Sequence, residues 1–220
     1  MAVITISRQY GSGGNEIAAR VCEILGYRYF DKKLMAQVAS EVGLSEEELV
    51  DFSEESYKVQ GFLDRLLNRP RIVLPEKTGT EGAADKGHWS VENLNEETCI
   101  AMVQKTIRAA YDQGNMVILG RGGQVILKDM TGVLHVRIEA TLGARVMRVQ
   151  EHRRISVAEA ERLTRSYDEA ADAYLKRYYD VDLASPLNYH LVINSGKWGI
   201  EASAQIIINA LSHLQTGIGI

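Results

Sequence analysis

A glycine-rich loop near the start of the chain constrains the fold more than any other feature. Residues 3–6 form a short apolar, β-branched run that predicts a buried strand. Residues 11–14 then read Gly-Ser-Gly-Gly, and apolar residues at helical spacing predict a helix over 16–25. In such a loop the backbone N–H groups can turn inward, and the helix N-terminus adds a partial positive charge. Strand, loop and helix together predict phosphate binding, with a tight turn that binds nothing as the alternative.

The loop departs from the standard patterns for nucleotide phosphates. Aligning the second glycine of G-x-x-x-x-G-K-[ST] with Gly13 places Arg8 at the first glycine. Gly14 then stands at the lysine, which would reach the β and γ phosphates, and Asn15 at the hydroxyl residue, which would hold magnesium. The dinucleotide pattern G-x-G-x-x-G also fails, although Asp31 lies about 20 residues on, where that pattern expects an acidic residue. The loop alone predicts a phosphate without naming the ligand.

The composition is that of an ordinary globular protein. The 220 residues are 45% hydrophobic and 25% charged, which is enough for a sizeable core. A net charge of −4 disfavours a nucleic-acid binder. The two cysteines make neither a disulfide framework nor a metal pattern, and no apolar run reaches membrane-span length. Since no signal peptide is visible either, we expect a protein of the reducing cytoplasm that binds neither nucleic acid nor membrane.

Strand patterns alternate with helical patterns along the chain. Strands are predicted at residues 3–6, 27–30, 116–119, 133–138 and 190–193, with helices between them and a last helix at 201–214. This alternation predicts a mainly parallel α/β sheet, in which ligands bind at the carboxyl ends of the strands. In the fourth strand, His135 and Arg137 alternate with apolar residues, so one face should be less buried. Residues 68–95 are predicted to form a long loop or a mobile insertion.

Several arginines stand where a phosphate could be bound. Arg121 lies between glycines just past the third strand, where its fork can contact a phosphate at two points. A basic cluster follows the fourth strand, at Arg145, Arg148, Arg153 and Arg154. Phosphoryl transfer needs positioning and neutralisation of charge, which mobile arginines supply. The alternatives are a surface arginine in a turn and a solvated helix face.

Two carboxylates are notable for their positions. Asp31 ends the second strand, where it could accept a hydrogen bond from a sugar hydroxyl or a base, or hold a metal-bound water. It could equally cap the helix that follows. Asp168 lies within a long helical pattern that contains Arg165, and we interpret it as a salt-bridge partner.

Motifs along nearly the whole chain resemble one known family. They are residues 4–14, residues 29–31 with Leu34, residues 118–123, residues 136–140 followed by Arg145 and Arg148, Asp168 with Tyr174, and residues 189–194. In this order they resemble the cytidylate kinase-like proteins, which belong with the P-loop nucleoside monophosphate (NMP) kinases. A glycine at the lysine position of the loop is itself typical of that branch.

The resemblance implies a P-loop kinase-like α/β fold. It would have a parallel five-stranded sheet flanked by helices, with an NMP-binding insertion and a small helical lid. As a single domain over 1–220, the core would cover about 1–31, 115–145 and 188–220, the insertion about 32–114 and the lid about 146–187. The activity implied is transfer of the γ-phosphoryl group of ATP to CMP or dCMP with Mg²⁺, so the partners would be small-molecule nucleotides.

The resemblance also implies roles for individual residues. The donor phosphates would be wrapped by the loop, at Tyr10, Gly11, Ser12, Gly13, Gly14, Asn15 and Glu16. The adenine would lie near Asn194, Ser195 and Gly196, while Asp31 and Arg121 would face the acceptor. Arg148, Arg153 and Arg154 would belong to the lid. We add the hypothesis that Arg8 supplies part of the missing lysine's charge from the other end of the loop.

Two departures from the kinases keep other functions open. The loop lysine is absent, and Ala170 and Ala171 occupy a lid segment where the kinases usually offer an arginine. Arg165, Lys176 or Arg177 could substitute for it. The alternatives are therefore a nucleotide-binding sensor or regulatory protein without turnover, and a kinase of another small acceptor. A dinucleotide oxidoreductase is a more distant alternative.

Overall fold

The computed structural model describes residues 2–30 and 96–215, and every structural statement below concerns these residues. Asp31 and the predicted loop at 68–95 lie outside the described residues. So do the helix predicted after Asp31 and most of the predicted insertion at 32–114. Within the part that is described, no helix combines the length and the apolar character needed to cross a membrane.

Five parallel strands form the centre of the fold, as the sequence predicts. They are β1 (Val3–Arg8), β2 (Arg28–Phe30), β3 (Met116–Leu119), β4 (Val133–Glu139) and β5 (Leu191–Asn194). Their order across the sheet is β2-β3-β1-β4-β5. Arg8, the last residue of β1, is in register with Ile138 of β4. The carboxyl ends of β1 and β4 therefore lie side by side, and whatever follows them can share one site.

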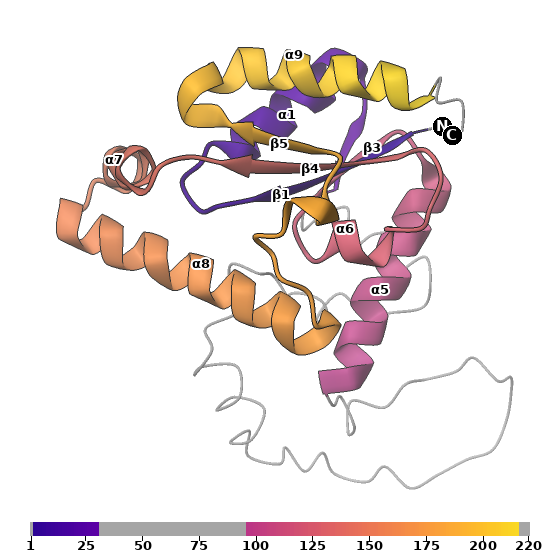
Figure 1. Ribbon diagram of the computed structural model, residues 1–220, viewed down its shortest axis with the longest axis horizontal. Helices are drawn as coiled ribbons and strands as arrows, with labels where there is room; N and C mark the ends of the chain where they lie inside the picture. Colours follow the sequence, from indigo (N-terminus) through magenta and orange to yellow (C-terminus); the bar gives the residue numbers. More distant parts are fainter. Residues whose placement is uncertain (1, 31–95, 216–220) are drawn as a thin grey trace, which may run out of the picture.

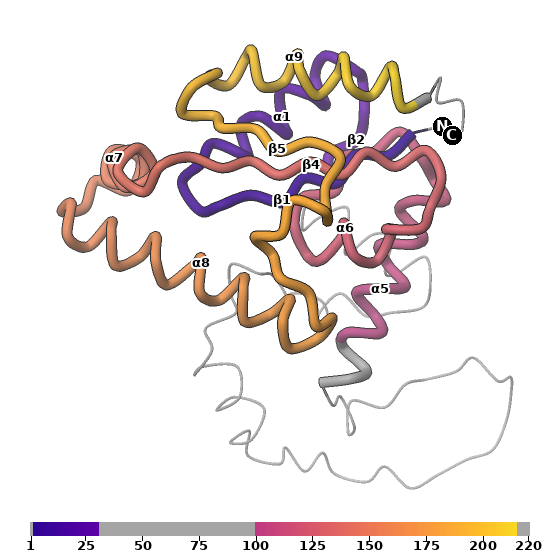
Figure 2. Tube along the Cα trace, in the orientation of Figure 1, coloured from indigo at the N-terminus to yellow at the C-terminus, as the bar shows by residue number. Residues whose placement is uncertain are grey.

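Helices cover both faces of this sheet. They are α1 (Gly14–Leu25), α5 (Glu96–Gln113), α6 (Gly123–Ile126), α7 (Leu142–Arg153), α8 (Val157–Tyr179) and α9 (Ser195–Gln215), with a short 3-10 turn η2 (Pro186–Asn188) before β5. Figure 1 shows α1 and α9 on one face and α5, α6 and α8 on the other. The tube in Figure 2 shows that α7 follows directly from the carboxyl end of β4 and turns sharply into α8.

The two faces of β1 fill two separate parts of the core. Ile4 and Ile6 are fully buried and pack with α1 and α9 residues such as Ile17. Val3, on the opposite face, packs with Val103 and other residues of α5. This burial of both faces explains why the strand reads as a mostly apolar run without alternation.

The predicted division into core, insertion and lid stays a prediction, although α5 packs on the sheet.

The polar residues of β4 are buried, so the prediction of a less buried face is wrong. His135 and Arg137 are each 4% exposed. The Thr5 hydroxyl lies 2.7 Å from Nδ1 of His135, and the rings of His135 and His190 stack with centroids 5.0 Å apart. Arg137 Nε donates to Glu139 Oε1 at 2.6 Å. These partners come from β1, from the residue just before β5 and from β4 itself, and they make the burial of the polar groups tolerable.

The helix ends follow the sequence closely, except in α9. The hydroxyls of Thr141 and Ser156 cap α7 and α8. The last helix, predicted to begin at Glu201, instead begins at Ser195 and is interrupted at Gly199, where φ is 70° and ψ is 179°. Glycine adopts this backbone at little cost. The first turn of α9 is thereby set at an angle that lets Ser195 reach the glycine loop, where its Oγ donates to the Ser12 carbonyl at 2.5 Å.

We expect buried His135 to make the fold sensitive to acid. Burial lowers its pKa from 6.5 to about 4, with a smaller contribution from His190. As the pH falls below 6.5, the unfolded chain binds a proton that the folded chain does not. The free energy of unfolding should therefore fall by at most about 1.4 kcal/mol per pH unit until the pH nears the folded value.

Urea unfolding at several pH values checks this expectation. Compared with the wild type, His135→Gln should show a shallower pH dependence between pH 6.5 and 4. His213→Gln, at an exposed histidine of α9, is the matched control. If the wild type and His135→Gln lose stability in parallel as the pH falls, His135 is not the source of the acid sensitivity.

Candidate active site

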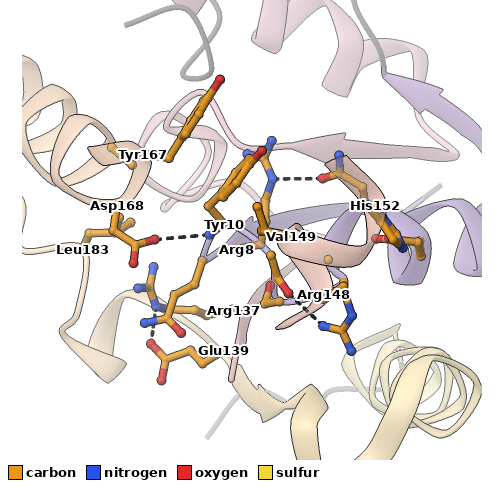
Figure 3. Close-up of a pocket in the computed structure, with 18 of the residues that line it drawn as sticks. Arg8, Tyr10, Arg137, Glu139, Arg148, Val149, His152, Tyr167, Asp168 and Leu183 are labelled. Carbon is orange, nitrogen blue, oxygen red and sulfur yellow. Dashed lines mark hydrogen bonds and ion pairs between the residues drawn. The ribbon is translucent and has the colours of Figure 1, made fainter. Parts of the chain in front are cut away.

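A cavity of about 450 Å³ opens at the carboxyl ends of β1 and β4, beneath the α7–α8 hairpin (Figure 3). The residues that line it come from five parts of the chain. They are residues 8–16 of the loop, Arg137 and Glu139 of β4, Arg148, Val149, His152 and Arg153 of α7, and Tyr167, Asp168, Ala171 and Asp172 of α8, with Leu183 and Ala184 beyond it. The cavity therefore lies where the parallel sheet predicts a ligand site.

The loop is packed so closely that two of its glycines cannot be replaced without strain. Gly11 and Gly13 have φ values of +75° and +81°, which disfavour other residues. A Cβ on Gly11 would lie 2.8 Å from the Arg145 carbonyl oxygen. A Cβ on Gly13 would lie 2.8 Å from Cδ1 of Ile200 in α9. The loop is thus held between α7 and α9 in one conformation.

Side chains from these helices bind three consecutive carbonyls of the loop. Arg145 Nη1 donates to the Tyr10 carbonyl at 3.1 Å, and Arg148 Nη1 donates to the Gly11 carbonyl at 2.8 Å. The Ser195 hydroxyl bonds the carbonyl of the next residue, Ser12. Carbonyls that are occupied in this way do not repel an anion with their partial negative charge. The arrangement favours a ligand that the loop meets with its N–H groups and with the N-terminus of α1.

An ion pair between buried Arg145 and half-buried Asp168 joins the loop to both helices of the hairpin. Arg145, which is 5% exposed, lies with its Nη1 2.7 Å from Oδ2 of Asp168. The other carboxylate oxygen of Asp168 accepts the Tyr10 N–H at 3.2 Å, as Figure 3 shows. The interpretation of Asp168 as a salt-bridge partner is confirmed. Arg145 is consequently a structural residue that holds the Tyr10 peptide in place.

Two tyrosines and an arginine form the upper side of the cavity. The rings of Tyr10 and Tyr167 stack with centroids 4.2 Å apart and planes inclined by 7°. Both tyrosine side chains raise the pKa of the Arg153 guanidinium, and Tyr10 has the larger effect. Arg153 thus keeps its positive charge at the cavity's edge. The tyrosine hydroxyls near it are neutral, and a guanidinium binds a charged phosphate more strongly than a neutral hydroxyl.

The floor of the cavity carries charges of both signs. Arg137 is fixed by Glu139 and by the Ser7 hydroxyl at 3.2 Å. Burial disfavours its charged form, but Glu139 and Tyr189 together outweigh this effect, so the pKa of Arg137 is raised. Burial also raises the pKa of Asp172, and Arg137 partly counteracts that shift. The cavity therefore contains the Glu139 carboxylate, which Arg137 holds in place, and the Asp172 carboxyl of α8.

Oxygen atoms suited to a magnesium ion lie in the cavity, although the described residues contain no group of three metal-ligating side chains. The Glu139 side chain is 35% exposed and lines the cavity, while Arg137 orients it. The hydroxyl of Ser12 is fully buried and has no hydrogen-bonding partner among the described residues. Magnesium in phosphate sites is usually held by one or two carboxylates, water and the phosphates themselves. This donor set fits such an ion.

Residues 3–197 match the family described as the cytidylate kinase-like family. The chain belongs to this family. A cytidylate kinase from Methanothrix thermoacetophila is 23% identical over 215 residues, covering 97% of this chain and 99% of that protein. One from Pyrococcus horikoshii is 26% identical over 219 residues, covering 96% and 89% of the two chains. The resemblance seen in the motifs is thereby confirmed.

Solved structures agree with this cytidylate kinase-like fold. An uncharacterized protein from Eubacterium ventriosum has a TM-score of 0.66 at 18% identity, with 96% of this chain and 99% of that one covered. A shikimate kinase from Bacteroides thetaiotaomicron has a TM-score of 0.50 at 12% identity, with 96% and 98% covered. At these identities the likeness concerns the fold.

The structure brings most of the predicted site residues of this cytidylate kinase-like chain together, but not all of them. Arg8, the loop through Glu16, Arg148 and Arg153 line the cavity. Arg154 is exposed at the end of α7 and does not line the cavity. Arg121, at φ 60°, lies past β3 and also outside the cavity lining. Asn194 and Gly196 bond each other, while Ser195 contacts the loop.

Several residues that line the cavity were not among the predicted site residues, and Glu139, Arg137, Tyr167 and Asp172 are the ones whose chemistry matters most. Glu139 follows the rule for strand ends and could have been found by it. The alternation in the fourth strand places Arg137 on a less buried face and so gives no sign that it lines a site. Tyr167 and Asp172 lie on α8 and line the cavity. The loop on its other side is far away in the sequence: the contact between Tyr10 and Asp168 joins residues 158 positions apart. Helical periodicity predicts a face but not its partner, so no signal for these two was available.

We expect the Arg145–Asp168 pair to contribute far more to stability than an exposed pair of the same length. Asp168→Asn would leave the Arg145 guanidinium buried without its counter-charge, at a cost of about 3 kcal/mol. The Arg165–Glu161 pair has the same 2.7 Å separation but side chains 58% and 45% exposed. Glu161→Gln should therefore cost less than about 1 kcal/mol. Urea unfolding measures both variants, and equal losses would contradict the structural role of Asp168.

Proposed function

We propose that the protein is a nucleoside monophosphate kinase that transfers the γ-phosphoryl group of ATP to CMP or dCMP. Membership of the cytidylate kinase-like family supports a nucleotide phosphotransferase. The observation that carries the proposal is the glycine loop, whose carbonyls are bound by Arg145, Arg148 and Ser195 at the edge of one cavity. A loop with bound carbonyls at the start of a helix suits the polyphosphate of a donor nucleotide.

In the reaction, an oxygen of the acceptor's phosphate bonds to the γ-phosphorus of ATP. The bond from that phosphorus to the oxygen bridging to the β-phosphorus breaks, so CMP becomes CDP and ADP leaves. Catalysis of this step consists mainly of positioning and charge stabilisation. Arg148 and Arg153 lie on the cavity wall above the loop and would neutralise charge on the transferred group. The loop would hold the β- and γ-phosphates.

A bound magnesium ion would neutralise charge on the ATP phosphates and lower their mutual repulsion. Glu139 and the Ser12 hydroxyl are the residues suited to hold it, directly or through water. Arg137 would keep the Glu139 carboxylate aimed at the cavity through its 2.6 Å hydrogen bond. Such orienting bonds commonly support metal-ligating carboxylates.

The choice of acceptor rests on the relatives, two of which are cytidylate kinases of Methanothrix thermoacetophila and Pyrococcus horikoshii. On this basis Arg121 and Asp31 would contact the acceptor, and residues 194–196 would approach the adenine. Residues of the predicted insertion would complete the acceptor site. The α7–α8 hairpin would serve as the lid, with Arg153 and Arg154 at its turn.

The first test measures ADP release from ATP and Mg²⁺ while each nucleoside monophosphate is offered in turn. We expect CMP or dCMP to raise the rate above that with ATP alone, with CDP or dCDP as the product. Stimulation by a different small acceptor would leave a kinase but overturn the CMP assignment. No stimulation by any acceptor, with ATP still raising the melting temperature, would favour the nucleotide-binding protein without turnover.

We expect Arg153 to act on the rate and to contribute little to ATP binding. Arg153→Ala should lower kcat by on the order of 10³, the lower end for a transition-state arginine, because other arginines share the cavity. The KM for ATP should change much less. Arg162→Ala, at an exposed arginine of α8 outside the cavity, is the matched control and should behave as the wild type. An unchanged kcat for Arg153→Ala would remove Arg153 from the mechanism.

A further inference from the structure

We propose that Arg8, Gly14 and Asn15 form one exchanged set, in which Arg8 does the work of the missing loop lysine and binds the β- and γ-phosphates of the donor. The inference rests on the proposed function, because it assumes a nucleoside triphosphate in the cavity. In the sequence, each of the three residues departs from the phosphate-loop pattern. In the structure, Arg8 occupies the space that a side chain at position 14 would need, and Asn15 binds Arg8.

The space around Gly14 explains why a side chain is absent there. A Cβ on Gly14 would lie 2.6 Å from Cβ and 2.9 Å from Cγ of Arg8, closer than real Cβ contacts come. Gly14 is not among the glycines with positive φ, so its backbone would accept any residue. What excludes a side chain is therefore Arg8 itself. A lysine at position 14 and an arginine at position 8 cannot coexist in this backbone.

The same distance shows where the Arg8 side chain begins. Its Cβ lies 2.6 Å from the place that the Cβ of a lysine at position 14 would take. The two side chains would therefore start from neighbouring points at the edge of the cavity, although one comes from the end of β1 and the other from the start of α1. An arginine is long enough to cover the reach of a lysine, and it brings a planar fork that can bind phosphate oxygens at two points.

Asn15 sets the direction of the Arg8 side chain. Nε of Arg8 donates to Oδ1 of Asn15 at 3.2 Å, in the first turn of α1. An amide oxygen accepts this bond from a fixed position, whereas a guanidinium carries five donor N–H groups and can contact a phosphate as well. The contact holds the positive charge beside the helix N-terminus, where an anion is favoured.

A buried hydroxyl at the same place points to a ligand. Ser12 is 0% exposed, and its Oγ has no hydrogen-bonding partner among the described residues. That oxygen lies 3.5 Å from the position of a Cβ on Gly14, beside the first carbons of Arg8. A buried polar group without a partner is costly. A phosphate or metal-bound oxygen in the cavity would satisfy it.

The test exchanges the two positions and measures MgATP binding by calorimetry, without an acceptor. Arg8→Ala should weaken binding by about 10- to 100-fold, the value of a charge-assisted hydrogen bond. Gly14→Lys alone should also weaken binding, because the new side chain meets Arg8. The double variant R8G/G14K recreates the spacing G-x-x-x-x-G-K and should recover most of the affinity. Arg108→Ala, at an exposed arginine of α5, is the matched control.

A second readout needs no ligand. Gly14→Ala should lower the melting temperature in the wild-type background, because its Cβ meets Arg8, and should lower it much less when combined with Arg8→Gly. This pair keeps the proposal testable if Gly14→Lys does not fold. Additive effects of the two substitutions would overturn the steric exchange.

The outcomes separate this inference from the proposed function. Wild-type affinity for MgATP in a folded Arg8→Ala variant would overturn the role of Arg8 and leave the kinase proposal standing. Loss of ATP binding in that variant, combined with no acceptor turnover by the wild type, would support Arg8 and overturn the kinase. A failure of R8G/G14K to bind better than Gly14→Lys would overturn the exchange. A wild-type protein that binds no ATP would overturn both.

Discussion

The contact of Asp168 with Arg145 and the Tyr10 peptide is the constraint on which the site depends. One carboxylate binds an arginine of α7 and an N–H of the glycine loop, and it does so from α8. The arginine in turn bonds the Tyr10 carbonyl. Both the N–H and the carbonyl of Tyr10 are thereby held by side chains from outside the loop. The loop, which has few side chains of its own, takes its shape from these helices.

The sequence predicts the sheet and the place of the site well, since both follow from local patterns. Apolar runs mark the strands, and the parallel alternation brings the ends of β1 and β4 to one edge. It fails where a polar side chain is buried by a distant partner. His135 and Arg137 read as an open face because periodicity records polarity and cannot see Thr5, Ser7 or Tyr189 packed against them.

Within the site, residues on the loop were easier to predict than residues facing it. The residues of a glycine loop are consecutive in the sequence, so the bounds of the loop can be predicted from the sequence alone. The stacking of Tyr10 on Tyr167, by contrast, joins residues that are far apart in the chain. Arg154 belongs to the predicted basic cluster but is exposed and does not line the cavity, so its role in the lid stays a prediction. A cluster of charged residues in the sequence does not show which of their side chains point into the cavity.

The crowding between Arg8 and Gly14 also bears on how such a loop can change over time. A chain with arginine and lysine at these two positions suffers a steric clash, and a chain with glycine at both has neither cation. Each single-step route between the two loop types therefore passes through an impaired ancestor. Lineages on either side should remain separated, with the pair of positions inherited as a unit.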